Sequence, residues 1–422
     1  MTSFEMAEVV ERVPGLDEGQ RFAIRGRVWR ADDTGLQEVL ALVRDTPERP
    51  RCLCVPGGVE MYVAKHRYYV VKRMPDTGKS HAPDCPSFEP DAAQSGLGAL
   101  VGESVIEREP GRVELRVAFA WTRMSGRGSS KAVLTETGEV EAKSRRMSLR
   151  AVMHYLFERA GFNRWTPAMA GKRNQGVFHK YLSEAAGEIV VKGVPMSDRL
   201  YVPEPFSEAG KAGAAKRRRD KLAVLRPHDG AAPLALVVGE LKAVETTGQA
   251  RRVWIRHMPD APLLATEELW LRVERKYASL LEARDADIQA RVRLILAALI
   301  RERREFTYEI DAASVTMLSE QWIPVEGVHE LPLIDALTSN GRRFIKPLRY
   351  DSAYAEGFAN ALLLDVGREA VPLHVVSAFT DGKRRAAKDR AIAGSDTPPW
   401  VWMLDQPMPP LPTRAAQADR RG

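Results

Sequence analysis

The three cysteines of this 422-residue chain, Cys52, Cys54 and Cys85, all lie within one stretch of 34 residues. Together with His81 they form the pattern C-x-C-x26-H-x3-C. Zinc is usually held in a tetrahedron by four Cys or His ligands, supplied as two short pairs that folding brings together. An odd number of cysteines and the absence of a signal peptide argue against a disulfide framework. The sequence therefore predicts a zinc site with four protein ligands and a structural role. The alternative is two buried cysteines, one spare cysteine and a surface histidine.

The segment between the two ligand pairs supports the zinc prediction. The sequence EMYVAKHRYYVVKRM, residues 60–74, contains two β-rich stretches on either side of Lys65, His66 and Arg67, which is typical of a hairpin. A hairpin of this length folds back and brings its two ends together. His66 is a further candidate ligand, but its place at the tip favours His81. Such a site contributes directly to the free energy of folding.

The tripeptide Gly78-Lys79-Ser80 matches the end of a phosphate-binding loop. That loop also needs a glycine five residues earlier, so that backbone N–H groups curl around phosphate, and Arg73 stands there. We therefore expect no ATP or GTP site.

Length and composition predict an α+β protein of several domains. The chain is 44% hydrophobic, and it has no run of about 18 apolar residues that would cross a membrane. Its N-terminus is acidic and amphipathic, so we expect a cytoplasmic protein with no membrane partner. The predicted parts are a zinc-binding module with β-strands (1–122), a linker (123–147), a helical subdomain (148–221), a mixed α/β domain (222–405) and a disordered tail (406–422).

The helical middle part has the order of a winged helix. Ser148 is a good N-cap for a first helix that ends at Gly161, and a second helix covers residues 176–187. Two short strands, 188–193 and 198–203, follow. Such outlines also arise in other small α+β subdomains.

The C-terminal domain mixes strands and helices. We predict strands within 222–258 and helices over 263–282 and 284–304. The second helix has an apolar stripe at helical spacing, formed by Ile288, Val292, Ile295, Leu296 and Leu299.

A helix over 330–338 is then followed by strand, strand, helix and strand. This order suggests a restriction-endonuclease-like topology with Asp365 at the end of one strand. The next strand has Val376 and Ala378 where a glutamate and a lysine would be needed, so this copy of the fold is predicted to be catalytically empty.

Basic residues form four clusters in the C-terminal half of a chain whose net charge is +7: residues 215–221, 301–304, 341–349 and 382–390. Arginine suits phosphate because its planar fork donates two hydrogen bonds at once. We therefore predict a nucleic-acid partner, most simply DNA. The alternative explanations are solvated helix faces or an interaction scaffold whose basic face meets an acidic protein. The candidate contacts are Lys172, Arg173, Arg217, Arg218, Arg219, Arg342, Arg343, Lys346, Arg349, Lys383, Arg384 and Arg385.

A second hypothesis is a metal-dependent nuclease of the PD-(D/E)xK type. In such enzymes carboxylates hold Mg²⁺ and a lysine orients the attacking water. Here Asp229 follows Pro227 and His228, and Glu240 and Lys242 come one hairpin later. Alternation along that strand would place Glu240 and Lys242 on one face. A turn at Asp229 and an ordinary surface pair explain the same residues.

The sequence resembles the uncharacterised bacterial family known as domain of unknown function 1173. The stretches that carry the likeness are RCLC, the segment from Met61 to Pro90, GFNRWTPAM, VVGELKAVE, IRHMPDAPL and FIKPLRYD. The three cysteines noted for that family match Cys52, Cys54 and Cys85. The resemblance implies a protein of plasmids and integrating conjugative elements, and it implies no defined activity. The layout is also similar, more distantly, to competence-type proteins that join a zinc module to a nuclease-like domain.

Overall fold

The computed structural model describes residues 20–65, 68–109, 111–124, 146–228, 230–248, 250–286, 292–352, 355–377 and 382–415. It is a mixed α+β protein that divides into two compact units. Unit 1 comprises Met1–Asp91, Asp365–Ala370 and Ala415–Gly422, and unit 2 comprises Ala92–Leu364 and Val371–Arg414. The first division therefore falls at residue 91 and not at the predicted residue 122. Most of the predicted linker, 125–145, lies outside the described residues.

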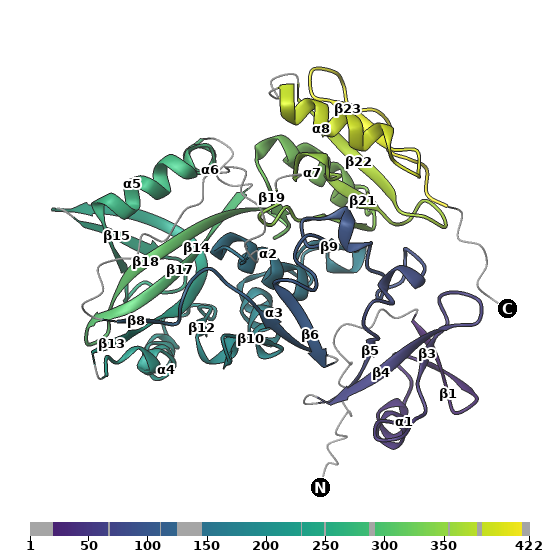
Figure 1. Cartoon of the computed structure of the whole chain (residues 1–422), viewed down its shortest axis with the longest axis horizontal. Coiled ribbons are helices and arrows are strands. Elements are labelled where there is room, and N and C mark those ends of the chain that lie inside the picture. The colour runs from purple at the N-terminus through teal and green to yellow at the C-terminus, as the bar shows by residue number, and fades with distance from the viewer. Residues whose placement is uncertain are drawn as a thin grey trace, which may run out of the picture. The chain divides into compact units, whose positions relative to one another are not determined.

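Unit 1 is built on one antiparallel sheet with the strand order β2-β1-β3-β4-β5 (Figure 1). The predicted hairpin is confirmed as β4 and β5, and the short helix α1 contributes Leu36, Leu40 and Val43 to the core. The elements are β1 (Arg21–Ile24), β2 (Arg27–Arg30), α1 (Leu36–Val43), β3 (Arg51–Cys52), β4 (Val59–Lys65) and β5 (Tyr69–Arg73).

The centre of unit 2 is a helix pair, α2 (Leu149–Arg159) and α3 (Gln175–Gly187), as predicted. The side chain of Ser148 caps α2 by accepting a hydrogen bond from the backbone N–H of Ala151. All residues of α2 from Ala151 to Phe157 are buried. A helix that is buried along most of its length is a core element.

The strands after α3 do not form the wing that we predicted. Residues of β10 (Ile189–Val191) pair with β11 (Val194–Pro195) and, in parallel, with β7 (Arg112–Leu115). The next strand, β12 (Leu200–Tyr201), joins a different sheet by pairing with β14 (Ala235–Thr247). The remaining strands of this region are β6 (Val105–Glu109), β8 (Thr122–Met124), β9 (Arg164–Trp165) and β13 (Ala231–Pro233).

A second part of unit 2 is a small closed barrel (Figure 1). Five strands pair around a circle in the order β14-β15-β16-β18-β17, and β17 returns to β14. Within the barrel, strand β14 pairs with two strands: its first half pairs with β17 and its second half with β15, with a bulge at Lys242 between them. The other elements are β15 (Ala250–Ile255), β16 (Leu263–Thr266), α5 (Glu267–Lys276), α6 (Ala278–Asp285), β17 (Val292–Arg304), β18 (Thr307–Ser319) and β19 (Pro324–Val325).

The prediction of a helix over 284–304 is wrong, because residues 292–304 form strand β17. Residues Leu294 to Ile300 are all buried, since one face of β17 fills the barrel and the other contributes to the core that contains α2. A strand that is buried on both faces has a continuous apolar run, and such a run cannot be told from a helix by periodicity.

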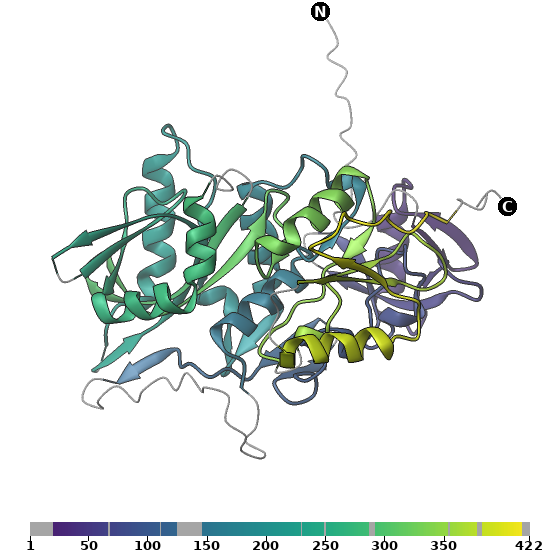
Figure 2. The ribbon, with the colours of Figure 1, turned by 90° about the horizontal axis from the view of Figure 1, so that it is seen from above.

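The C-terminal part of unit 2 has the predicted order of helix, strands, helix and strand. Its sheet runs β23-β22-β21-β20-β9, with antiparallel pairs from β9 to β22 and a parallel pair between β22 and β23. Figure 2 shows α8, the yellow helix, beside these strands. The elements are α7 (Leu331–Ser339), β20 (Phe344–Ile345), β21 (Ala361–Leu363), β22 (Val371–Val376), α8 (Gly382–Ala393) and β23 (Trp400–Met403).

A buried polar network joins the elements around this sheet. The carboxylate of Glu330 lies 3.1 Å from Lys346 Nζ and accepts a hydrogen bond from Asn360 Nδ2 at 2.7 Å. The other side-chain atom of Asn360, Oδ1, accepts from Lys388 Nζ of α8 at 2.8 Å. All four side chains are buried, so their mutual hydrogen bonds replace those that water would make.

The predicted disordered tail is partly ordered. The indole N–H groups of Trp400 and Trp402 donate to the carbonyl oxygens of Pro410 and Gln406 at 3.0 and 2.9 Å. Residues 406–415 are therefore held to the sheet, whereas 416–422 lie outside the described residues. Within the described ranges, no helix has the length and apolar character that a membrane crossing requires.

Candidate metal centre and basic surface

The four predicted metal ligands, Cys52, Cys54, His81 and Cys85, meet in unit 1, with their ligand atoms all within 4.8 Å of one another. The Sγ atoms of Cys52 and Cys85 are 3.7 Å apart. His81 Nδ1 lies 3.3 Å from Cys54 Sγ and 3.7 Å from Cys85 Sγ. A tetrahedral ion with bonds of about 2.0–2.3 Å separates its ligand atoms by about 3.5–3.8 Å. The cluster can therefore bind one metal ion.

Local structure explains how Cys52 and Cys85 reach the centre. Cys52 ends β3, where it pairs with Phe22 on one side and Val59 on the other. Cys85 stands in a turn whose backbone N–H donates to the carbonyl oxygen of Ala82 at 2.9 Å. Three of the four ligands are buried, and Cys54 is half-buried.

The Gly78-Lys79-Ser80 tripeptide forms a single 3₁₀ turn directly before His81. Gly78 is required by packing, because a Cβ atom on it would lie 2.6 Å from the Cβ of Glu89. Its carbonyl oxygen accepts the backbone N–H of Glu89 at 3.2 Å, which closes the loop that carries Cys85. The tripeptide thus positions the metal ligands.

Hydrogen-bond donors surround the sulfur atoms. Gln20 Nε2 lies 3.5 Å from Cys52 Sγ and donates to Ser87 Oγ at 3.0 Å. The backbone N–H of Ser87 donates to Cys85 Sγ at 3.4 Å. N–H groups aimed at sulfur favour the thiolate, which is the form that binds metal.

Without a metal, the crowded cluster distributes its protons unequally. Hydrogen bonds from Cys54 and Cys85 lower the pKa of Cys52 well below its usual range. The resulting Cys52 thiolate raises the pKa of the Cys85 thiol. Burial opposes protonation of His81, but the adjacent Cys52 and Cys54 outweigh it and raise the imidazole pKa to about 9. A bound cation would remove this conflict, so metal binding should release protons.

Five of the twelve predicted nucleic-acid contacts serve the interior of unit 2. Arg218, Arg342 and Lys346 are buried, and Lys346 pairs with buried Glu330. Arg173 donates to the carbonyl oxygens of Phe162 and Gly161 at 3.0 and 2.9 Å, and burial lowers its pKa to about 10. Arg349 pairs with Glu356 at 3.0 Å. The sequence prediction is corrected for these residues, because three of the side chains are buried and the half-buried Arg173 and Arg349 are engaged by groups of the protein itself.

Helix α4 (Lys211–Leu222) divides its basic run between the interior and the surface. Arg218 makes a bidentate ion pair with Asp260, with nitrogen–oxygen distances of 3.0 and 2.5 Å, and so fixes the buried side of the helix. Arg217 is exposed and pairs with Glu204 at 2.6 Å. Arg219 is exposed and stacks on the Phe306 ring, 5.2 Å from its centroid. Lys216 and Lys221 are also exposed on this helix.

The remaining predicted contacts lie elsewhere on unit 2. Lys172 is exposed in the loop before α3, and Arg343 is half-buried before β20. On α8, Lys383 and Arg384 are exposed and half-buried Arg385 pairs with Asp389 at 3.1 Å.

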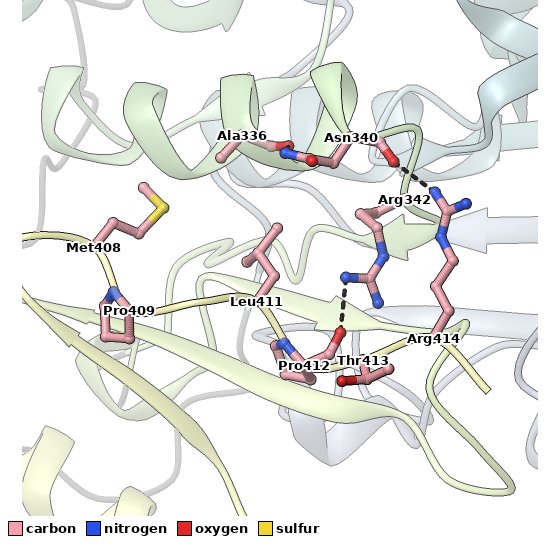
Figure 3. A pocket seen from close by; sticks show the side chains of 9 residues that line it. All are labelled: Ala336, Asn340, Arg342, Met408, Pro409, Leu411, Pro412, Thr413 and Arg414. Atoms are coloured by element: carbon pink, nitrogen blue, oxygen red, sulfur yellow. Dashed lines mark hydrogen bonds between the residues drawn. The ribbon is translucent and has the colours of Figure 1, made fainter.

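A pocket of about 560 Å³ contains Arg342 (Figure 3). Its walls come from α7, the turn after it and the C-terminal segment. Arg342 donates to the carbonyl oxygen of Pro412 at 2.8 Å, and Arg414 donates to that of Gly341 at 2.7 Å. Both guanidinium groups therefore tie the C-terminal segment to the end of α7, and Figure 3 shows Met408 at the opposite end of the pocket.

Of the proposed nuclease residues, the structure describes Glu240 and Lys242, and these two do not form a free metal site. Asp229 lies outside the described residues. Glu240 is buried, and its two oxygens are held by Arg256 at 3.0 Å and Arg293 at 3.1 Å. Lys242 is exposed at the bulge of β14, which interrupts the alternation that we used to place it beside Glu240. A carboxylate engaged by two arginines is not available as a magnesium ligand.

The comparison with family models gives one match. The model described as a protein of unknown function (DUF1173) matches residues 22–405. The chain belongs to the DUF1173 family. No curated protein and no solved structure matches it.

In this DUF1173 member, no sequence pattern predicted Gln20, whose amide contacts Cys52 although the two residues are 32 positions apart. The same holds for Arg256 and Arg293, which form ion pairs with the Glu240 carboxylate. No local motif marks such partners, because long-range pairing decides them.

Proposed function

We propose that this chain is a zinc-containing nucleic-acid-binding protein of a mobile genetic element. Three sulfur atoms and one imidazole nitrogen at tetrahedral spacing are the ligands that zinc prefers. Four protein ligands leave no open position, so the zinc is structural and holds the loop 78–89 to β3. The mobile-element setting rests on the resemblance to proteins of plasmids and integrating conjugative elements.

The observation that carries nucleic-acid binding is the construction of α4. A bidentate pair between buried Arg218 and exposed Asp260 anchors this helix, so Lys216, Arg219 and Lys221 share its exposed side. A cluster of cations on one side of an anchored helix attracts phosphates, and binding releases counterions from the nucleic acid.

Metal analysis of the purified protein tests the zinc proposal. We expect one zinc ion per chain. A chain that folds in full without metal would contradict the proposal.

Binding to labelled DNA over a series of salt concentrations tests the second part. We expect the logarithm of the binding constant to fall linearly with the logarithm of salt concentration, because phosphate contacts release counterions. The double substitution Lys216→Glu and Lys221→Glu should weaken binding by about tenfold or more and reduce the slope by about 2.

The matched control reverses two exposed charges in unit 1, Arg30→Glu and Arg49→Glu, and changes net charge equally. If both double variants weaken binding to the same extent, net charge and not α4 is responsible. If the protein binds an acidic protein but no nucleic acid, the scaffold alternative is correct.

A further inference from the structure

The closed barrel of unit 2 has a distinctive strand order. Taken in chain order from β14, the strands pair as first-second-third-fifth-fourth and back to the first. All pairs are antiparallel except the one between the third strand, β16, and the fifth, β18. Helices α5 and α6 connect the third strand to the fourth. A five-stranded Greek-key barrel of this kind is the architecture of the OB-fold, in which the face of strands two and three and two flanking loops carry oligonucleotides.

The bend in β14 shows how the barrel closes. A Cβ atom on Gly239 would lie 2.5 Å from Ile255 Cγ2. Only glycine, which has no side chain, therefore allows β14 to approach β15 this closely. The bulge at Lys242 follows at once. Glycine and a bulge are the usual means of turning a strand around a barrel corner.

The barrel strands β15 and β16 lie outside the large core cluster of unit 2 and contact helix α5 at one end. The large core cluster around α2 and α3 includes residues of β14, β17 and β18, for example Val238, Leu299 and Leu318. Within the described ranges this cluster includes no residue of β15 or β16. On β15, Val253 and Ile255 are buried, whereas Arg252 is exposed and Trp254 is half-buried. Arg252 and Trp254 therefore lie on the outer face of the barrel.

Strand register places a continuous row of side chains across this face. Arg252 pairs with Leu264 of β16, Leu264 with Glu309 of β18, and Glu309 with Arg301 of β17. Directly paired residues share a face of a sheet. The carboxylate of Glu309 is shared by Arg301 and Arg303, at 3.1 and 3.9 Å, so this group of three keeps one positive charge. Glu245, opposite Arg252, is the acid at the far end of the row.

Two aromatic side chains accompany these cations. Trp254 lies two residues from Arg252 on β15. Phe306, in the turn between β17 and β18, is 40% exposed and has a backbone φ of 58°, which a bulky residue rarely adopts. Its ring carries the Arg219 guanidinium of α4, so this turn adjoins the basic helix. Aromatic rings with arginines along a groove are the means by which single strands are bound without sequence preference.

We propose that the outer face of β15 and β16, with the turn at Phe306, binds single-stranded nucleic acid. Trp254 and Phe306 stack on bases, and Arg252 and Arg303 contact phosphates. This inference rests on the proposed function and adds to it the strandedness of the ligand and the location of its site. A duplex keeps its bases stacked inside, so it cannot use the aromatic rings and binds by charge alone.

Fluorescence anisotropy with the full chain tests this proposal. The probe is a labelled oligothymidylate of about 15 nucleotides, within the length that one such barrel covers. The comparison is a duplex of the same length at the same salt concentration. We expect the single strand to bind about tenfold more tightly than the duplex. Trp254→Ala should weaken single-strand binding by about tenfold and leave duplex binding unchanged.

Trp254→Phe keeps a stacking ring and should stay within about twofold of the natural chain. The surface control Arg390→Ala, on exposed α8, should also stay within about twofold. If Trp254→Ala does not fold, Arg252→Glu replaces it, because Arg252 is exposed and its loss leaves the barrel core intact.

The outcomes separate this inference from the proposed function. Equal binding of single strand and duplex, with no effect of Trp254→Ala or Arg252→Glu, would overturn the inference and leave nucleic-acid binding in place. Failure to bind either probe at low salt would overturn both.

Discussion

Unit 1 and the barrel of unit 2 are both small β-structures, but they are stabilised in different ways. Unit 1 brings Cys52 and Cys85, 33 residues apart, into one cluster that also includes His81, and its described apolar core is limited to side chains such as Phe22, Leu40 and Met61. The barrel closes on itself and joins a core cluster that extends from Leu100 to Tyr350. A bound metal would therefore contribute more to the stability of the small sheet in unit 1 than to unit 2, whose larger core supplies its own stability.

The two regions also differ in how far the sequence predicts them. The four Cys and His residues of unit 1 can be recognised directly from their spacing in the sequence. A closed barrel depends on pairings such as Ala235 with Ile300, which no local pattern specifies. Breaking each region separately therefore tests whether the two units are as independent as this comparison implies.

The largest effect is expected for Cys85→Ser. It removes one of four ligands, and structural zinc contributes on the order of 10 kcal/mol to the folding of such modules. We expect metal loss and collapse of hydrogen-exchange protection in residues 20–91, with protection in β17 and β18 retained. Ser80→Ala, at an exposed position beside His81, is the control and should retain metal. Global unfolding in the cysteine variant would show that the units are not independent.

Phe178→Ala should destabilise unit 2, the other region in this comparison. Phe178 is fully buried among Phe157, Phe162 and Trp322, with ring centroids 5.1–6.2 Å away. Removing it leaves a cavity that costs about 3–5 kcal/mol in the free energy of unfolding. Denaturant titration should show this loss, while the metal content stays unchanged. Lys180→Ala, exposed on the same helix, should change stability by less than about 0.5 kcal/mol.

Gln20→Ala sharpens the description of the metal centre. Its amide contacts Cys52 Sγ and Ser87 Oγ, so its loss should weaken metal affinity by about tenfold without preventing folding. Competition with a chromophoric chelator measures this change. Gln37 is the matched control, because its amide holds the Tyr69 backbone through two bonds of 2.9 Å and contacts no ligand. An equal loss of affinity in Gln37→Ala would assign the effect to general destabilisation of the sheet.

The smallest effect is a pH dependence confined to unit 2. Burial lowers the pKa of Lys388 to about 7; the nearby charges of Arg349 and Lys346 also lower it, and those of Glu330 and Glu356 oppose the shift. Below pH 7 the Lys388 amine is protonated in both the folded and the unfolded state, and its buried charge disfavours folding. Between there and the ordinary value of 10.5, only the unfolded state holds the proton, so the free energy of unfolding rises with pH.

The rise should approach about 1 kcal/mol per pH unit just above neutrality. Lys388→Met should flatten it, whereas Lys383→Met, at an exposed position of the same helix, should not. Denaturant titrations between pH 7 and 9 measure the difference, and an identical slope in both variants would contradict the assignment.

Prediction from sequence succeeded where the signal is local. Ser148 and Gly161 correctly bounded α2, and the β4–β5 hairpin followed from its β-rich stretches. It failed at β17, where burial on both faces produced an apolar run that was taken for a helix. It also failed for Arg218, Arg342 and Lys346, because a run of basic residues does not reveal which member turns inward.

The candidate site shows the same division. The four metal ligands were predicted from count and spacing. The partners that complete or occupy a site were not, since Gln20 and the arginines around Glu240 are distant in sequence.

By itself, the sequence determined the Cys/His cluster that can hold a metal, helices α2 and α3, the β4–β5 hairpin and the family. These depend on neighbours a few residues apart, whose geometry is set by the local backbone. Only the tertiary structure decided that five strands close into a barrel, that the predicted wing joins two other sheets, and which cations face solvent. Those outcomes depend on pairings between segments up to many tens of residues apart, and the free energy of burial that selects them is a property of the whole core.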